Sequence, residues 1–207
     1  QGGQREAYNV VPLATAGFTD PDTDYGNWTQ EERDEKAREL LAEAGYSADN
    51  PLEFKLLYNT SETHKKIATA IVQMWKQKLN VNAELNNMEW RTMLETARND
   101  EFDMVRYAWI GDYNEASTFL DLYTSDSPQN WANYDNPEVD QMMASAKVSS
   151  NPGPIYTDIE KILARDMPVI PIYHYTSVIM LNTQVKGWPM NNIQQNWYSR
   201  NLYKVAE

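Results

Sequence analysis

The sequence predicts an α/β fold in which a mainly parallel sheet is flanked by helices. Three stretches, at 52–58, 81–85 and 104–110, have the residue types of strands, and the first two alternate apolar and polar side chains. Amphipathic stretches at 62–79 and 89–98 separate them and are typical of helices. Because strands joined by a helix run in the same direction, this order predicts right-handed crossovers and a parallel sheet.

An earlier helix is predicted from 29 to 45. The sequence TQEE at 29–32 is a capping box, in which the Thr29 hydroxyl and the Glu32 carboxylate satisfy free backbone amides. Gly45 is placed to end the helix. The apolar residues on one side of this helix are Ala37, Leu40, Leu41 and Ala44. The buried side of the 62–79 helix is expected to carry Ile67, Ala70, Ile71, Met74 and Trp75.

The chain after Gly111 is predicted to be mainly helical at first and then extended. Asn136 and Pro137 have the residue types of a helix cap and a first helical position. The expected elements are helices at 117–123, 137–147 and from 155, a linker at 151–154, and strands at 168–175, 178–181 and 201–205. The two prolines of the 168–175 strand place it near a sheet edge.

Composition excludes several classes of function. The 207 residues include 18 Lys and Arg against 30 Asp and Glu, a formal net charge of -12, so no basic surface is present to follow nucleic-acid phosphates. The lack of cysteine excludes thiol chemistry, disulfides and thiolate metal sites. No apolar run approaches the roughly 18 residues of a membrane span. The amino-terminal residues are not a signal peptide, which leaves a cytosolic protein or a trimmed piece whose export signal lay elsewhere.

The stretch 102–119 carries the strongest binding signal. It brings a guanidinium (Arg106), an indole (Trp109), a bendable backbone (Gly111) and a carboxylate (Asp112) to the end of a predicted strand. Ligands bind at such ends because the scaffold is rigid there and polar groups still reach solvent. With 7 Trp and 13 Tyr in a polar chain, this favours an amphoteric, partly apolar ligand. The alternative is a core strand followed by a solvated turn.

The sequence gives weak support to the hypotheses of an enzyme or a metal-binding protein. Asp112 and Glu115 lie three residues apart in one turn, unlike the carboxylates of a glycosidase, which face each other about 5–10 Å apart across a cleft. Ser61 and His64 lack an orienting acid. His64 and His174 are the two histidines, and no HxxxH, EF-hand, phosphate loop or dinucleotide fingerprint occurs. We therefore expect no enzyme, no metal site and no cofactor.

Five stretches in order resemble one family: LLAEAGY at 40–46, LLYNTSETHKK at 56–66, EW at 89–90, FDMVRYAWIGDYNEASTFL at 102–120 and VIPIYHY at 169–175. They closely resemble the carboxy-terminal lobe of oligopeptide-binding proteins, the family 5 solute receptors of peptide ABC importers. The similarity runs from about 8 to 205. It implies a periplasmic-binding-protein-like (type II) lobe. Members of the family are more than twice this length and close two lobes over a ligand.

The resemblance implies a role for the central stretch. A peptide is held extended, its main chain hydrogen-bonded to strand edges, and Ala108, Trp109 and Ile110 match the strand end that pairs with it. Asp112 matches the aspartate that accepts the ligand's α-ammonium. Trp90 and Trp109 match tryptophans that form the wall of a roomy side-chain pocket.

Four further residues receive roles from the same resemblance. Arg106 matches a guanidinium near the carboxyl end of the ligand, and His64 matches a histidine that serves longer or shorter peptides. Asn59 and Tyr8 are candidates for polar contacts in the cleft. His64 also has a simpler reading as an exposed residue of a first helical turn.

The chain departs from the family at one position. Ala97 stands where the family has a second arginine, and the neighbouring Arg98 points about 100° away on a helix, which leaves the preferred peptide length open. Receptors of this architecture also bind dipeptides, murein peptides, nickel chelates, haem or oligosaccharides. Asp112 discriminates among these ligands, because one without an ammonium would leave a carboxylate buried and unpaired. Its alternative role is to cap the following helix.

The resemblance also implies a division of the chain and a set of partners. Residues 1–28 are expected to form an irregular arm or hinge region, 29–187 the ligand-binding lobe, and 188–207 a tail that would return to the missing amino-terminal lobe. Short peptides are the expected ligands, and the full-length protein would deliver them to a membrane permease from the periplasm or another extracytoplasmic compartment. Since one lobe supplies half of the hydrogen bonds, weak peptide binding is expected from this chain alone.

Overall fold

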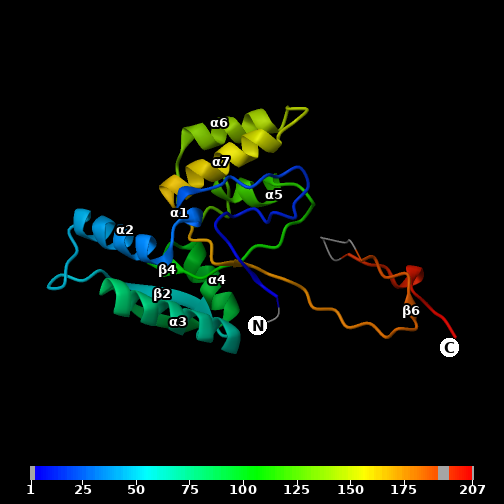
Figure 1. Cartoon of the computed structure of the whole chain (residues 1–207), viewed down its shortest axis with the longest axis horizontal. Helices are drawn as coiled ribbons and strands as arrows, with labels where there is room; N and C mark the ends of the chain where they lie inside the picture. Colours follow the sequence, from blue (N-terminus) through cyan, green and yellow to red (C-terminus); the bar gives the residue numbers. More distant parts are fainter. Residues whose placement is uncertain (1–2, 191–195, 207) are drawn as a thin grey trace. The chain divides into compact units, whose positions relative to one another are not determined.

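The computed structural model describes residues 3–190 and 196–206 and separates the chain into two units (Figure 1). Unit 1 comprises Gln1–Thr23 and Ile110–Glu207, and unit 2 comprises Asp24–Trp109. The predicted division of the chain at 28 and 187 stays a prediction. Within its tail, residues 191–195 and 207 lie outside the described residues.

A three-stranded parallel sheet forms the centre of unit 2. Its order is β3 (Asn82–Met88), β2 (Glu53–Asn59) and β4 (Met104–Val105), and β2 pairs parallel with both neighbours. Leu56 lies opposite Leu85 on one side and Met104 on the other. The prediction of a parallel sheet built from strands that alternate with helices is confirmed.

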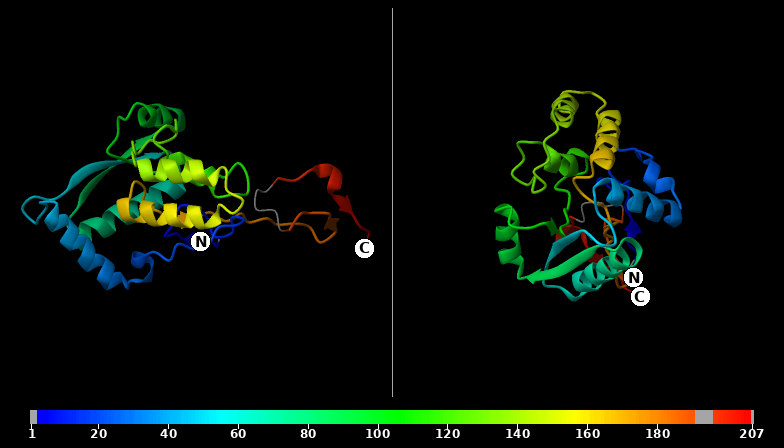
Figure 2. Two further views of the ribbon diagram at one scale, coloured as in Figure 1. Left: turned by 90° about the horizontal axis from the view of Figure 1, so that it is seen from above. Right: turned by 90° about the vertical axis from the view of Figure 1, so that its left-hand side faces the viewer.

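Four helices complete unit 2, namely α1 (Asp24–Asn27), α2 (Gln30–Glu43), α3 (Glu62–Leu79) and α4 (Trp90–Arg98). Figure 2 shows α3 and α4 on different sides of the strands. On one side, Ala68 and Val72 of α3 pack against Leu56 and Tyr58 of β2. The intervening Leu57 is buried on the opposite face, as the alternation of a strand requires. The sheet is therefore covered on both faces.

The helix boundaries in unit 2 follow their capping residues. The Thr29 and Glu32 capping box is present at the start of α2, and Gly45 after its end has a positive φ of 89°. α3 has the predicted bounds, with Ser61 as its amino-terminal cap and Asn80 in the left-handed conformation at its end. These boundaries confirm the predictions.

Helices dominate the core of unit 1. They are α5 (Ser117–Leu120), the 3-10 turn η1 (Asp121–Tyr123), α6 (Pro137–Ala146) and α7 (Gly153–Asp166). Leu120, Met143 and Ile159 are fully buried between them, and Val11 and Phe18 of the amino-terminal arm belong to the same buried cluster. The arm is thus part of this core.

Short antiparallel ribbons make up the remaining regular structure of unit 1. β1 (Arg5–Glu6) pairs with β5 (Tyr173–His174), and β6 (Val185–Lys186) pairs with β7 (Tyr203–Lys204), which follows the 3-10 turn η2 (Ser199–Asn201). Within the described part of the chain, no helix is long and apolar enough to cross a bilayer.

Several predicted details were wrong. The strand predicted at 104–110 covers only Met104–Val105. A hydrogen bond from Arg106 N to Leu57 O at 2.7 Å follows it, and the residues after Arg106 are not assigned to the strand. The strand at 168–175 is reduced to Tyr173–His174, and 178–181 forms no strand. The 151–154 linker is also too long, since α7 begins at Gly153.

The predicted buried side of α3 was displaced around the helix. Ala68 and Val72 are its buried residues, whereas Ala70 and Met74 of the predicted set are exposed. α2 buries none of its residues, so its apolar side is not a core face.

Candidate functional site

The carboxyl ends of the three parallel strands bring four predicted residues to one edge of unit 2. Asn59 is the last residue of β2, Trp90 begins α4 directly after β3, and Arg106 follows β4. The carboxyl ends of parallel strands are where α/β sheets bind ligands, because side chains from successive loops converge there. His64, in the first turn of α3, lies at the same edge.

His64 and Asn59 are joined directly. The ring Nδ1 of His64 lies 2.8 Å from Asn59 Oδ1, and an amide oxygen can only accept, so this contact requires the proton on Nδ1. Burial, and then the positive charge of Arg106, lower the pKa of His64. The positive charge of Arg106 therefore acts on the His64 ring, and like burial it favours the neutral form of the histidine.

An aromatic pair adjoins this group. The Trp90 and Tyr107 rings stack in parallel, with centroids 6.2 Å apart and an interplanar angle of 5°. Trp90 is 43% exposed, so the pair presents an apolar surface to solvent. Tyr107 is absent from the sequence-based set, although its place next to Arg106 is a signal that could have found it. The Trp109 Nε1 is buried and has no hydrogen-bond partner among the described residues.

The other predicted residues lie in unit 1 or precede it directly. Ala108 is exposed at the end of unit 2, and Ile110, the first residue of this part of unit 1, is 86% exposed. In the described ranges, 108–110 belongs to no strand. Tyr8 is half-buried in the amino-terminal arm, where its hydroxyl donates to Glu6 Oε2 at 3.0 Å.

Asp112 lies on a turn that is packed against α5. Its side chain is exposed, and its amide donates to Thr118 Oγ1 at 2.9 Å. A Cβ at Gly111 would lie 2.9 Å from the Phe119 ring and 3.0 Å from the Thr118 methyl group, so the backbone approaches α5 closely where glycine stands. The structure thus presents the carboxylate to solvent on an anchored backbone.

A hydrogen-bond network that the sequence did not reveal lies beneath this turn. The side chain of Glu115 accepts hydrogen bonds from the hydroxyls of Ser117 and Tyr156, and Tyr156 belongs to α7. The Tyr113 hydroxyl lies 3.0 Å from Ser117 Oγ. The Glu115 to Tyr156 contact spans 41 residues of sequence, which is why no local pattern signals it.

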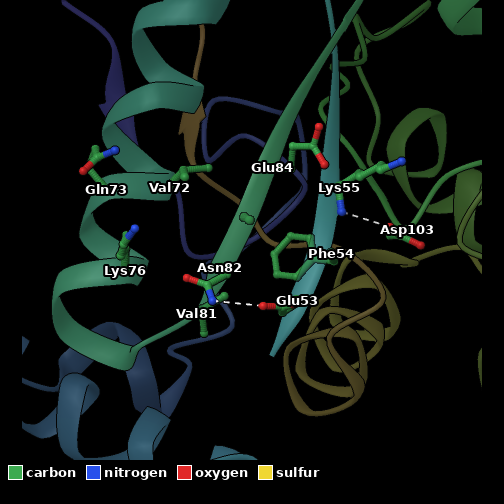
Figure 3. A pocket seen from close by; sticks show the side chains of 11 residues that line it. Glu53, Phe54, Lys55, Val72, Gln73, Lys76, Val81, Asn82, Glu84 and Asp103 are labelled. Carbon is green, nitrogen blue, oxygen red and sulfur yellow. Dashed lines mark hydrogen bonds between the residues drawn. The ribbon is translucent and has the colours of Figure 1, made fainter. Parts of the chain in front are cut away.

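The cavity in unit 2 is not formed by any of these residues. It has a volume of about 570 Å³ and lies at the amino ends of the strands, where the Glu53 carboxylate accepts a hydrogen bond from the Asn82 side chain and the Asp103 carboxylate accepts one from the Lys55 amide (Figure 3). Asn59, Trp90 and Arg106 lie at the other ends of the same strands. Within residues 3–190 and 196–206, no group of three His, Asp or Glu side chains is arranged to hold a metal ion.

Comparison with known proteins identifies the family. The profile of the bacterial extracellular solute-binding proteins, family 5 (middle region), matches residues 1–131. This chain belongs to that family. Members of family 5 are transport receptors and not enzymes, so the expectation that the chain is not an enzyme is confirmed.

Family 5 relatives match almost the whole chain. The periplasmic murein peptide-binding protein MppA of Escherichia coli is 41% identical over 98% of this chain, and the periplasmic oligopeptide-binding protein OppA of the same organism is 40% identical over 98%. The crystal structure of Haemophilus influenzae OppA in complex with RPPGFSPFR has a TM-score of 0.86 and 35% identity over 99% of the chain. The predicted family and fold class are confirmed.

This chain spans only part of its family 5 relatives. It covers 38% of the length of the two Escherichia coli proteins and 41% of the Haemophilus influenzae chain.

Proposed function

We propose that this chain is the peptide-holding lobe of the extracytoplasmic receptor of an oligopeptide ABC importer. In this proposal, the full-length receptor works in the periplasm or cell envelope and delivers short peptides to a membrane permease. The membership of family 5 and the peptide-binding relatives support the ligand class.

The position of Asp112 carries the proposal. Its carboxylate is exposed at the end of a stretch whose backbone groups at 108–110 are outside any strand of the described residues. A peptide laid along 108–110 would pair with this backbone independently of its sequence, because every peptide offers the same N–H and C=O groups. The α-ammonium at the end of such a peptide would then form a charge-assisted hydrogen bond with Asp112.

The strand-end group of unit 2 supports the same ligand class. Arg106 offers a planar guanidinium that suits the carboxyl end of a peptide, and the neutral His64 beside it can exchange hydrogen bonds without adding charge. Trp90 and Trp109 supply aromatic surface for side chains of many shapes, while Asn59 offers a polar contact. These groups together fit a ligand with a charged end and a varied, partly apolar body.

A comparison of free and amino-acetylated peptides tests the proposal. In the full-length receptor, Asp112→Asn should weaken binding of a free-amine tripeptide by about 10- to 100-fold, since a hydrogen bond between charged groups is worth about 1.5–3 kcal/mol. Binding of the same peptide with an acetylated amino group should change little. Asp126→Asn, at an exposed aspartate elsewhere in unit 1, is the matched control. Equal affinities of wild type and Asp112→Asn for the free amine would refute the assignment.

A murein peptide is the second candidate ligand, since MppA is the relative with 41% identity. Native mass spectrometry of the receptor, purified without refolding, distinguishes the candidates. A ladder of short linear peptides supports the oligopeptide assignment, whereas a single cell-wall peptide mass supports the murein one. A sugar, haem or nickel chelate in the receptor would contradict both.

A further inference from the structure

We propose that Tyr156 is a positioning residue which, through Glu115, fixes the turn that carries Asp112. This inference rests on the proposed role of Asp112 in gripping the ammonium of a peptide. Tyr156 lies in α7, 44 positions along the chain from Asp112. In this proposal it touches no ligand but affects how strongly Asp112 binds the ammonium.

A continuous set of hydrogen bonds links Tyr156 to the Asp112 backbone. The Tyr156 hydroxyl donates to the side chain of Glu115, and the carbonyl oxygen of Glu115 accepts from the Thr118 amide at 3.3 Å. Thr118 Oγ1 in turn accepts from the Asp112 amide at 2.9 Å. Each step joins the turn at 112–118 either to itself or to α7.

The Glu115 carboxylate is the centre of this set. Ser117 donates a second hydrogen bond to it, and the Tyr113 hydroxyl lies 3.0 Å from Ser117 Oγ. Two hydroxyl donors, Ser117 of α5 and Tyr156 of α7, therefore hold the Glu115 carboxylate. Removal of the α7 donor leaves Ser117, which belongs to the same short segment and cannot anchor it to the rest of unit 1.

The hydrogen bond from Tyr156 to Glu115, which we call the anchor of the turn, is strengthened by burial. Tyr156 is only 4% exposed, Thr118 is 4% exposed, and Ser117 is 7% exposed, while Asp112 itself is exposed. A buried hydroxyl without a partner is unfavourable, so Tyr156 and Glu115 favour a single arrangement. Burial, and then the hydrogen bond to Glu115, raise the pKa of Tyr156, so the hydroxyl keeps its proton and remains a donor.

Binding of an ammonium by Asp112 depends on the placement of its carboxylate. Hydrogen bonds lose strength steeply with poor geometry, and an exposed carboxylate on a mobile turn must be ordered at the moment of binding. An anchored turn avoids that ordering cost. Loss of the anchor should therefore reduce affinity only for ligands that Asp112 holds.

Amide exchange in the 207-residue chain tests the anchor without any ligand. Tyr156→Phe keeps the ring and removes only the hydroxyl. We expect the Asp112 and Thr118 amides to exchange about 10-fold faster in this variant, measured by NMR. Tyr134→Phe is the matched control, because the Tyr134 hydroxyl also donates to a carboxylate in unit 1, that of Asp166 at 2.5 Å. Unchanged exchange at Asp112 and Thr118 in Tyr156→Phe would overturn the inference.

Peptide affinity in the full-length receptor tests the consequence. The ratio of affinities for a free-amine peptide and its acetylated form isolates the contribution of the ammonium. Tyr156→Phe should lower this ratio about 3- to 10-fold, and Tyr134→Phe should leave it unchanged. Glu115→Gln, which keeps one acceptor oxygen, should give a smaller decrease. An equal loss of affinity for both peptides would show a merely structural role and overturn the inference.

The failures of the two proposals are distinguishable. If Asp112→Asn lowers the ratio while Tyr156→Phe keeps the wild-type value, the positioning role alone is refuted. If Asp112→Asn itself leaves the ratio unchanged, the ammonium grip is refuted, and the positioning role falls with it.

Discussion

The buried carboxylate of Glu160 should make unit 1 less stable as the pH rises. Glu160 lies in α7, is 1% exposed, and accepts hydrogen bonds from the amides of Val10 at 3.1 Å and Val11 at 2.6 Å. It thereby joins the amino-terminal arm to the helical core. Burial raises the pKa of Glu160 from the usual 4.5 to about 7, since the two amide donors only partly offset the loss of hydration.

The sign and size of the effect follow from this difference. The folded protein binds the Glu160 proton more tightly than the unfolded chain, so the free energy of unfolding decreases as the pH rises from about 4.5 to about 7. One pKa unit corresponds to about 1.36 kcal/mol, which gives a loss of about 3 kcal/mol across this range. Below it both states are protonated and above it both are ionised, so the contribution is constant outside the range.

Glu160→Gln isolates this contribution because glutamine does not titrate. The free energy of unfolding of the 207-residue chain is measured in urea at pH 4.5 and 7.5. Between these two pH values it should fall by about 3 kcal/mol more in wild type than in Glu160→Gln. The neighbouring titratable groups, Asp20 and Tyr123, remain in both proteins. Asp158→Asn, at an exposed position of the same helix, should keep the wild-type pH dependence. Parallel pH profiles of wild type and Glu160→Gln would refute the reasoning.

Two further predictions test packing and electrostatics. Gly153→Ala should lower the free energy of unfolding by about 1–3 kcal/mol in urea, because the added Cβ would overlap the carbonyl oxygen of Gly17, and an unchanged value would contradict this close approach. Arg106→Gln should raise the pKa of His64 in an NMR titration, because the positive charge that helps to lower it is removed. Arg98→Gln should leave the His64 pKa as it is, and equal effects of both substitutions would refute a specific influence of Arg106 on His64.

Local sequence determined the helix ends well. The Thr29 hydroxyl and the Glu32 carboxylate are three residues apart, so their reciprocal capping depends on nothing distant. The same holds for Asn136, whose side chain accepts from the Glu138 amide, and for Pro137 at the first position of α6. Such signals concern one turn of helix, and tertiary contacts have little power to override them.

The extent of strands was harder to predict because a strand needs a partner. The run at 104–110 has the composition of a strand, yet it pairs with β2 for only two residues before the backbone leaves the sheet. The buried side of α3 was misjudged for a related reason. Ala68 and Val72 are small enough for the helix to approach the sheet, while the larger Met74 remains 55% exposed, a choice that depends on the facing strand.

The same distinction between local and distant contacts applies to the candidate site, and its contacts in unit 2 could be anticipated from the order of the elements. The pairing of His64 with Asn59 and the stacking of Trp90 on Tyr107 arise where chain segments meet at the ends of neighbouring parallel strands, a convergence that the order of strands and helices already implies. Four of the predicted residues therefore lie at one edge of unit 2.

The contacts of Glu160 and Tyr156 in unit 1 had no such signal in the sequence. Glu160 meets the arm across 149 and 150 residues, and Tyr156 meets Glu115 across 41. Both side chains come from the same helix, one turn apart, and each joins a different irregular segment to the core. A glutamate and a tyrosine on a helix read as ordinary residues in sequence. Their importance arises only from burial, which makes an unsatisfied oxygen or hydroxyl costly and so turns each contact into a fixed point for a segment that lacks regular structure.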